Sequence, residues 1–197
     1  MNLKKGLLIL GAFVTISAFA KTEEWRIDED HSSVRFSIRH LVSTVYGSLG
    51  GAMGHITLDD SKPTAMKADA SFDINTINTG NEKRDGHLKS PDFFNASAFP
   101  KIEFKSKSVS KSGSGFDMKG DLSMHGVTKE VTVHLDAPTE AAKGMMNDWR
   151  RGLNGKITVK RGDFGISWNK TLDAGHVMIG DEVKGEIALE LVRTEKK

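Results

Sequence analysis

The chain of 197 residues contains no cysteine, only four prolines and a single tyrosine. Without cysteine it has no disulfides, no thiolate metal site and no cysteine nucleophile, so the hydrophobic core alone must hold the fold together. Neither sign of charge dominates, because 28 basic residues stand against 26 acidic ones and both are interleaved along the chain. Nucleic-acid binding needs a basic face, so this pattern argues against a nucleic-acid partner.

Long hydrophobic runs are absent after residues 1–20. In that segment Lys4 and Lys5 precede a short apolar stretch, and an A-x-A sequence ends at Ala20, as in a signal peptide. The apolar stretch is too short to span a bilayer comfortably, although an uncleaved anchor is the alternative. We expect cleavage after Ala20, which leaves residues 21–197 as one exported, soluble domain. Loss of the two lysines lowers the formal charge from +2 to 0.

Most of the remaining sequence alternates apolar and polar residues with a period of two. Val34, Phe36 and Ile38, for example, are separated by polar side chains. Such runs predict half-buried β-strands. Similar runs cover residues 66–75, 101–107, 116–124, 127–135, 153–159 and 183–191.

Several connections can also be predicted from the sequence. His125-Gly126 separates two runs with almost no spacer, which indicates a tight hairpin. The glycine-rich segment Tyr46–Leu58 suggests one long, bent strand with bulges. Residues 138–148 form a polar connection, for which we expect a helical turn at Glu140–Met146.

Each predicted strand has one apolar face, and no helix is long enough to cover a sheet. The apolar faces must therefore meet each other, either in a sandwich or in a closed barrel of about eight antiparallel strands. Small residues on these faces favour a barrel with internal volume, although the glycines alone are also explained as bends. These small residues are Ala68, Ala70, Ser106, Ser108, Gly120, Gly155 and Gly185.

One segment interrupts the strands. Residues 81–89 predict a short charged helix, Ser90-Pro91 suggests a second helical turn, and a strand follows over Lys101–Val109. A single helix in an all-β chain plugs, braces or gates the barrel. We favour a bracing role for the helix and for its residues Arg84, Asp85 and His87, with Arg84 either paired with Asp85 or facing an anionic head group.

No catalytic constellation is present. The seven histidines lack the H-x-H and H-E-x-x-H spacings of metal sites, and there is no G-x-S-x-G elbow. We therefore predict no catalytic residue, no metal site and no enzymatic activity. His40 shares the inward parity of its strand, so it is either a polar contact at a pocket mouth or a partner for a neighbouring loop.

Taken together, the chain resembles the YceI family of exported polyisoprenoid-binding, lipocalin-like proteins. The resemblance extends from Trp25 to Val192, and its most specific block is Arg84–Phe94. The other matching blocks are Asp30–Leu41, Phe99–Phe104, Gly120–Lys129 and Phe164–Val183. It implies an all-β fold, an eight-stranded antiparallel lipocalin-like β-barrel with a short helix packed against it. It also implies a periplasmic location, a bound isoprenoid-type lipid with no other cofactor, and a possible homodimer.

The expected function is to hold a long polyisoprenoid, such as an isoprenoid quinone, or a similar amphiphile, for transport, storage or stress protection. Two alternatives are a redox-linked or metal-dependent barrel that uses His40, His87 and Arg84, and a protein that binds another exported protein. The side chains predicted to contact lipid lie on the inward faces and in the loop around Trp168. They are Phe36, Ile38, His40, Met53, Phe72, Ile74, Phe104, Leu122, Met124, Val131, Val133, Ile157, Phe164, Ile166, Trp168 and Met178.

Overall fold

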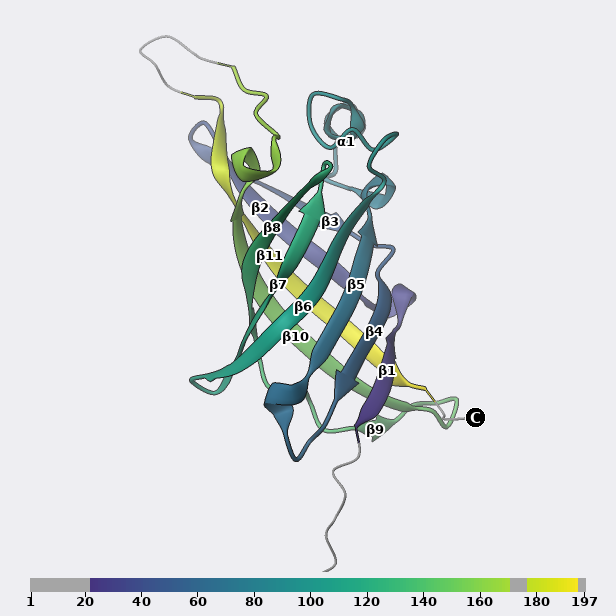
Figure 1. Ribbon diagram of the computed structural model, residues 1–197. Helices are drawn as coiled ribbons and strands as arrows, with labels where there is room; N and C mark the ends of the chain where they lie inside the picture. Colours follow the sequence, from purple (N-terminus) through teal and green to yellow (C-terminus); the bar gives the residue numbers. More distant parts are fainter. Residues whose placement is uncertain (1–21, 171–176, 195–197) are drawn as a thin grey trace, which may run out of the picture.

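In the computed structural model, which describes residues 22–170 and 177–194, the alternating runs form antiparallel strands that wrap into a barrel (Figure 1). The strands are β1 (Glu23–Ile27), β2 (Ser33–His40), β3 (Ser43–Leu49), β4 (Met53–Leu58), β5 (Lys67–Asp73), β6 (Lys101–Ser112), β7 (Gly115–Met124), β8 (Val127–Leu135), β9 (Ala142–Lys143), β10 (Trp149–Lys160) and β11 (Ile179–Arg193). The helices are η1 (Glu29–His31), η2 (Pro63–Ala65), η3 (Ile74–Thr76), α1 (Glu82–Lys89) and η4 (Arg161–Phe164).

Strand β11 closes the barrel. It pairs with β10 on one side, and on the other with β2 over its first part and with β1 over its last residues. β1 and β2 therefore occupy one position in the ring, interrupted by η1, and β3 and β4 occupy the next. With β5 to β8, β10 and β11 the barrel has eight strand positions, which confirms the predicted closed eight-stranded barrel.

Two predictions about the connections are wrong. The segment Tyr46–Leu58 is not one bent strand, because the chain leaves the sheet between β3 and β4, where Gly51 has a φ of +62°. The expected helical turn at Glu140–Met146 is absent as well. There β9 pairs with the first residues of β10, and this hairpin satisfies backbone groups that a helical turn would otherwise use.

The segment that leads into α1 contacts the free edge of β3. Strand β3 pairs with β2 on one edge, while within the described chain its other edge makes only an isolated bridge from Ser48 to Asn78. The helix begins where the Asn81 side chain accepts a hydrogen bond from the Arg84 amide at 3.0 Å. It lies across one end of the barrel, which we call the α1 end (Figure 1).

The predicted second helical turn after Ser90 does not form. Residues 91–98 are a series of turns, and Asn95 has a left-handed φ of +48° that ends any helical path. The turns bury Phe93 and Ala96 in the protein instead. The helix itself and the strand after it are confirmed, the latter as β6.

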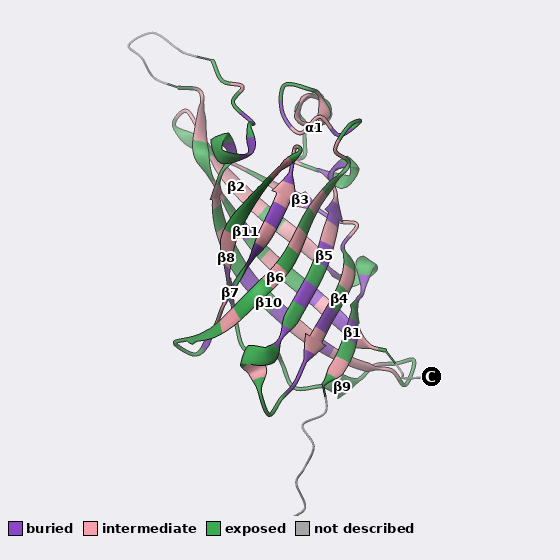
Figure 2. Cartoon of the chain, viewed as in Figure 1, coloured by how far each residue is buried: buried purple, intermediate pink, exposed green. Residues whose placement is uncertain are grey.

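Burial alternates along the strands, with inward residues buried and outward residues exposed (Figure 2). At the end of the barrel opposite α1 the interior is solidly filled by apolar side chains, including Trp25, Ile27, Leu58, Met66 and Leu191. No helix among the described residues is long and apolar enough to cross a membrane. The filled end contrasts with the α1 end, where the interior is open.

Candidate ligand cavity

The barrel encloses a cavity of about 530 Å³ that extends from the α1 end towards the filled end. Its described wall is formed by inward side chains from the strands, and residues of α1 and the turns after it cover part of the open end. All but six of these side chains are apolar or glycine. The six polar ones are His40, Thr79, Lys83, Arg84, His87 and Arg161. A volume of this size is in the usual range for small-molecule sites.

Small inward residues account for part of this volume. Ala68 and Ala70 line the cavity, so their short side chains leave space in the wall. Gly185 also lines it, but the side chain of Ile157 occupies the space beside this glycine. Gly120 and Gly155 have a different role, because the ring of Phe104 and the side chain of Leu135 occupy the space beside them. The two alanines therefore fit the interpretation that small residues leave internal volume, and the glycines make room for neighbouring side chains. Ser108 is exposed, because a register shift in β6 between Ser106 and Ser108 changes the face to which the next residues point.

The structure places most of the residues predicted to contact lipid in the cavity wall. Whether they bind lipid remains a prediction, but their position fits it. The twelve wall residues are Phe36, Ile38, His40, Phe72, Phe104, Leu122, Met124, Val133, Ile157, Ile166, Trp168 and Met178.

Four other predicted contacts are corrected by the structure. Met53 lies on the outer face of β4 with 47% of its surface exposed, because its strand begins one residue out of phase with the assumed alternation. Ile74 and Phe164 are each only 1% exposed and pack in clusters behind the wall. Val131 points inward, yet it packs against the cluster around Leu122 and does not reach the cavity.

Of the three α1 residues for which the sequence predicts a bracing role, Arg84 and His87 also line the cavity, whereas Asp85 does not. Asp85 Oδ1 accepts hydrogen bonds from the amide and the hydroxyl of Thr79, at 2.9 and 2.5 Å. Arg84 donates to the hydroxyl and the carbonyl of the same Thr79, at 2.7 and 2.9 Å. Arg84 and Asp85 thus hold Thr79 jointly, while the side chains of Lys83, Arg84 and His87 reach the cavity. The charged sequence of α1 gave no apolar pattern from which this position could be inferred.

An aromatic group closes part of the mouth. The His87 ring lies edge-on to both Phe93 and Trp168, with centroids 4.9 Å apart in each case. His87 Nε2 also lies 2.9 Å from Asp92 Oδ2, which fixes the ring on its outer side. Three separate segments therefore meet at His87, the helix, the turns after it and the loop before β11.

Arg161 is the buried cation of the site, and the sequence analysis did not single it out. It is 7% exposed and lines the cavity from η4. Its Nε donates to the carbonyl of Gly180 at 2.9 Å, and Nη1 donates to the carbonyls of Ile166 and Trp168, both at 2.8 Å. Burial lowers the pKa of the guanidinium from its ordinary value, and the nearby Asp181 opposes this effect. An arginine nevertheless stays protonated in proteins.

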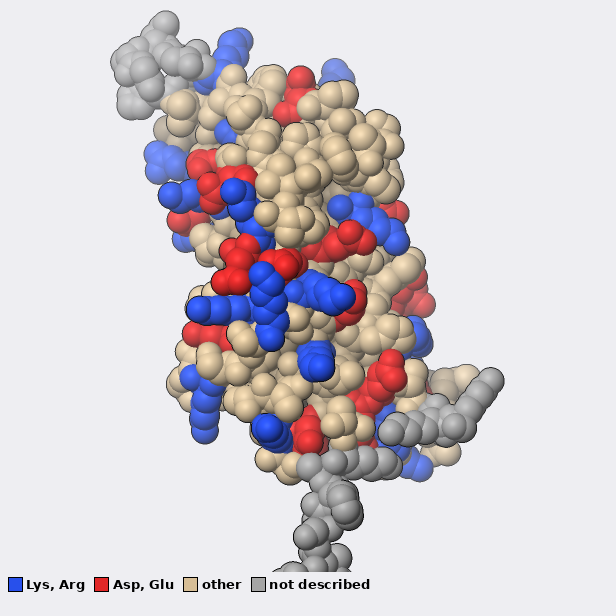
Figure 3. All heavy atoms as spheres, in the orientation of Figure 1, with Lys and Arg blue, Asp and Glu red and all other residues tan. Residues whose placement is uncertain are grey.

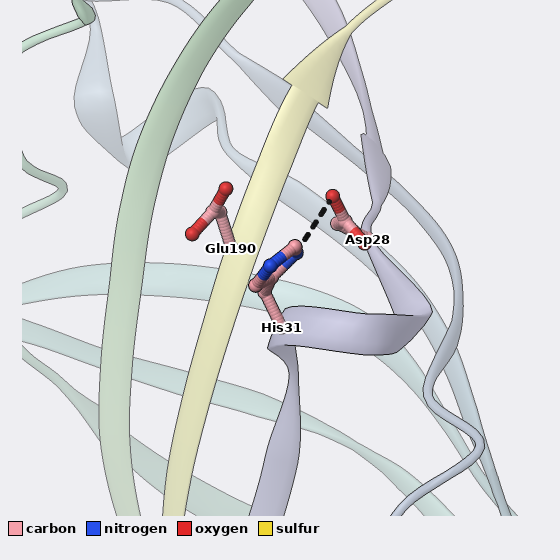
Figure 4. Close-up of side chains that lie close together, drawn as sticks. All are labelled: Asp28, His31 and Glu190. Atoms are coloured by element: carbon pink, nitrogen blue, oxygen red, sulfur yellow. Dashed lines mark ion pairs between the residues drawn. The ribbon is translucent and has the colours of Figure 1, made fainter. Parts of the chain in front are cut away.

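A second polar cluster lies away from α1. Asp28, His31 and Glu190 lie close together (Figure 4), and within the described chain they have the spacing of possible metal ligands. Arg150 already occupies this cluster, with Nη1 2.7 Å from Asp28 Oδ2 and in contact with Glu190, and Nη2 2.8 Å from Asp148. The three carboxylates raise the pKa of Arg150 above its ordinary value, and its charge takes the place of a cation. We therefore interpret the cluster as a structural clasp.

Because of this clasp of Asp28, His31, Glu190 and Arg150, we expect the free energy of unfolding to fall at acidic pH. Burial opposes ionisation of Asp28, but hydrogen bonds from His31, Arg150 and the Asp30 amide outweigh it and hold the pKa of Asp28 below its usual 3.8. Because the pKa of Asp28 is lower in the folded chain than in the unfolded chain, its carboxylate stabilises the fold at a pH above the unfolded-state pKa. This contribution to the unfolding free energy decreases from about pH 5 downward, as the pH falls towards the folded-state pKa. Urea unfolding between pH 7 and pH 3 should show the loss.

Asp28→Asn is the matched variant, because it removes the titrating group and keeps the shape. Its unfolding free energy should fall less steeply with acid than that of the unmodified chain. Asp59 and Asp117 also have lowered pKa values, so the difference between the two chains is the quantity to read. Parallel pH profiles would rule out a contribution from Asp28.

The fold and the cavity define a class, the lipocalin-like barrels with an apolar interior chamber. A family model of YceI-like domains matches residues 25–191. A UPF0312 protein of Staphylococcus aureus (strain MSSA476) is 38% identical over 169 residues, covering 85% of this chain and 96% of the relative. A UPF0312 protein of Yersinia pestis (strain Pestoides F) is 34% identical over 163 residues, covering 81% and 84%. The chain belongs to the YceI-like family.

Solved structures agree with this fold. BcnA of Burkholderia cenocepacia superposes with a TM-score of 0.72 at 19% identity, covering 83% of this chain and 98% of BcnA. A polyisoprenoid-binding domain from Saccharophagus degradans gives a TM-score of 0.60 at 14% identity, covering 86% and 98%. At these identities the likeness establishes the barrel architecture.

Proposed function

We propose that the protein binds a long-chain lipid of the polyisoprenoid type in the barrel cavity. The observation that carries the proposal is the apolar cavity, which is open at the α1 end and filled at the other. Each buried CH₂ group contributes about 0.8 kcal/mol, so roughly ten buried carbons supply about 8 kcal/mol towards the cost of association. The polyisoprenoid-binding neighbour supports the same ligand class.

The experiment is native mass spectrometry of protein purified from its host without detergent, followed by solvent extraction and analysis of the released lipid. A mass increment that disappears on extraction, together with an isoprenoid in the extract, is the expected result. A chain that carries no lipid, and that takes up none when mixed with polyprenols in detergent, would contradict the proposal.

The proposal includes the cellular setting. A signal peptide cut after Ala20 would deliver the protein to the periplasm, where a carrier protects a water-insoluble chain during transport, storage or stress. N-terminal sequencing of protein from the periplasmic fraction tests both the cut and the compartment. A homodimer remains a prediction, which light scattering during gel filtration tests.

Binding, with no catalysis, fits the mouth better than the redox-linked or metal-dependent alternative. His87 is held by Asp92 and two aromatic rings. His40 pairs with Ile179 across the β2–β11 ladder and lines the cavity. Within residues 22–170 and 177–194, neither histidine belongs to a group with metal-ligand spacing. We therefore propose binding as the function of this site.

A further inference from the structure

The polar groups at the mouth share one sign of charge. Lys83 and Arg84 from α1 and Arg161 from η4 line the cavity together with two histidines, His40 and His87. No aspartate or glutamate is among the described residues of the wall. This contrasts with the outer surface, where acidic and basic side chains are mixed (Figure 3).

The acidic residues near the mouth already have partners. Asp85 accepts two hydrogen bonds from Thr79, and Asp92 lies against His87. Asp181 accepts a hydrogen bond from the amide of Gly162 at 2.9 Å and influences Arg161 only through space. Asp181 favours the charged form of Arg161 from a distance, but among the described residues none of these carboxylates forms a salt bridge with a cation of the wall.

Arg161 is the most deeply buried of these cations, with more than nine-tenths of its surface covered. Its hydrogen-bond partners among the described residues are three backbone carbonyls, which satisfy Nε and Nη1 but bring no full negative charge. Nη2 has no hydrogen-bond partner among residues 22–170 and 177–194. A buried charge without a counter-ion is costly, and a ligand that supplies the counter-ion removes this cost.

The cations form one continuous site. Arg161 holds the carbonyl of Trp168, and the Trp168 ring contacts the ring of His87 on α1. The same helix carries Lys83 and Arg84 to the wall. In a chamber with apolar walls the fields of these groups add and are weakly screened, so an anion is attracted to this end.

We propose that the mouth binds the oxyanionic head group of the lipid, a carboxylate or a phosphate, with Arg161 as the buried anchor and Lys83 and Arg84 as its outer partners. This inference rests on the proposed lipid-binding function. A guanidinium suits both head groups, since each offers two oxygens to its planar donors. The tail then extends into the apolar part of the cavity.

The test uses three probes with the same tail, namely hexadecanoate, hexadecyl phosphate and hexadecanol, in a fluorescence displacement titration. Both anions should bind at least about tenfold more tightly than the alcohol, as expected for charge-assisted hydrogen bonds. The ratio between the two anions identifies the preferred head group. Selectivity should weaken as the salt concentration rises.

Arg161→Gln should reduce the preference for anions to about threefold or less and leave hexadecanol binding nearly unchanged. Because Arg161 also holds three carbonyls, a second variant, Lys83→Gln with Arg84→Gln, tests the outer part of the site without touching η4. It should lower the preference for anions partially. Lys156→Gln on the outer face of β10 is the control for Arg161→Gln, because each variant loses one positive charge. It should keep the full preference for anions.

Equal affinity of the unmodified chain for the alcohol and both anions would overturn the inference while leaving lipid binding intact. An equal loss of selectivity in Lys156→Gln would overturn it too, because it would show a non-specific charge effect. If none of the three probes binds, the proposed lipid-binding function fails first, and this inference fails with it.

Discussion

Replacement of Ala70 by phenylalanine is expected to weaken the binding of long-chain lipid at least about tenfold while the barrel stays folded. Ala70 lies on β5 with its side chain in the cavity wall, opposite Phe104 in the β5–β6 pairing. The added ring must occupy space that the ligand would otherwise use. Filling a packed core costs about 1–3 kcal/mol, but here the ring enters an existing chamber, so the unfolding free energy should change little.

The measurement combines probe displacement with urea unfolding. Ser71→Phe is the matched control, because the next residue of the same strand points to the outer face. It should keep the affinity of the unmodified chain. Unchanged lipid affinity in Ala70→Phe would show that the ligand does not occupy this part of the barrel.

The barrel could be predicted from the sequence because its cause is local. Strand side chains alternate between faces, so Val34, Phe36 and Ile38 had to share one face whatever the rest of the chain did. With no long amphipathic helix to cover them, the apolar faces had to close on one another. This reasoning predicts about eight antiparallel strands in a sandwich or a barrel, and the small inward residues and the family resemblance favoured the barrel that the structure shows. Most of the twelve predicted contacts in the wall follow from the alternation, and the others come from the loop around Trp168.

The sequence could not predict which inward side chains reach the cavity. The alternation shows on which face of a strand a side chain lies, but not how far it extends into the interior. Ile74 and Phe164 are as apolar as Phe72 and Ile166, yet the former lie behind the wall and the latter in it. The difference arises from η3 and η4, which turn side chains out of the barrel ladder. Such turns depend on tertiary packing and leave no periodic signal.

Two arginines with structural roles, Arg161 and Arg150, could not be singled out from the sequence, although Arg84, His87 and His40 were. Arg161 follows directly on β10 in a polar sequence, and only the folded chain shows that three carbonyls bury it. Likewise, Arg150 meets Asp28 across 122 residues and Glu190 across 40. Such contacts between residues far apart in the sequence depend on the register of the paired strands. The turns and the closed barrel fix this register together, so it cannot be derived from one segment alone.

Replacement of Phe164 by alanine should lower the free energy of unfolding by about 3–5 kcal/mol, the cost of deleting a fully buried aromatic ring. Phe164 is 1% exposed and packs with Phe93, Leu122, Met124 and Ile166. Its backbone carbonyl, which lies 3.0 Å from His125 Nδ1, is unaffected by the change. The loss is therefore a packing effect, and urea unfolding measures it.

Measurement of lipid affinity distinguishes Phe164 from the residues that line the cavity. Because the Phe164 ring lies behind the wall, the alanine variant should bind the three probes within about threefold of the unmodified chain at low urea. Phe36→Ala is the counterpart, since its ring lines the cavity and is only partly buried. It should cost less stability and more affinity. A Phe164 variant that remains fully stable but loses lipid would return this residue to the contact surface, and it would show that the chamber extends behind η4.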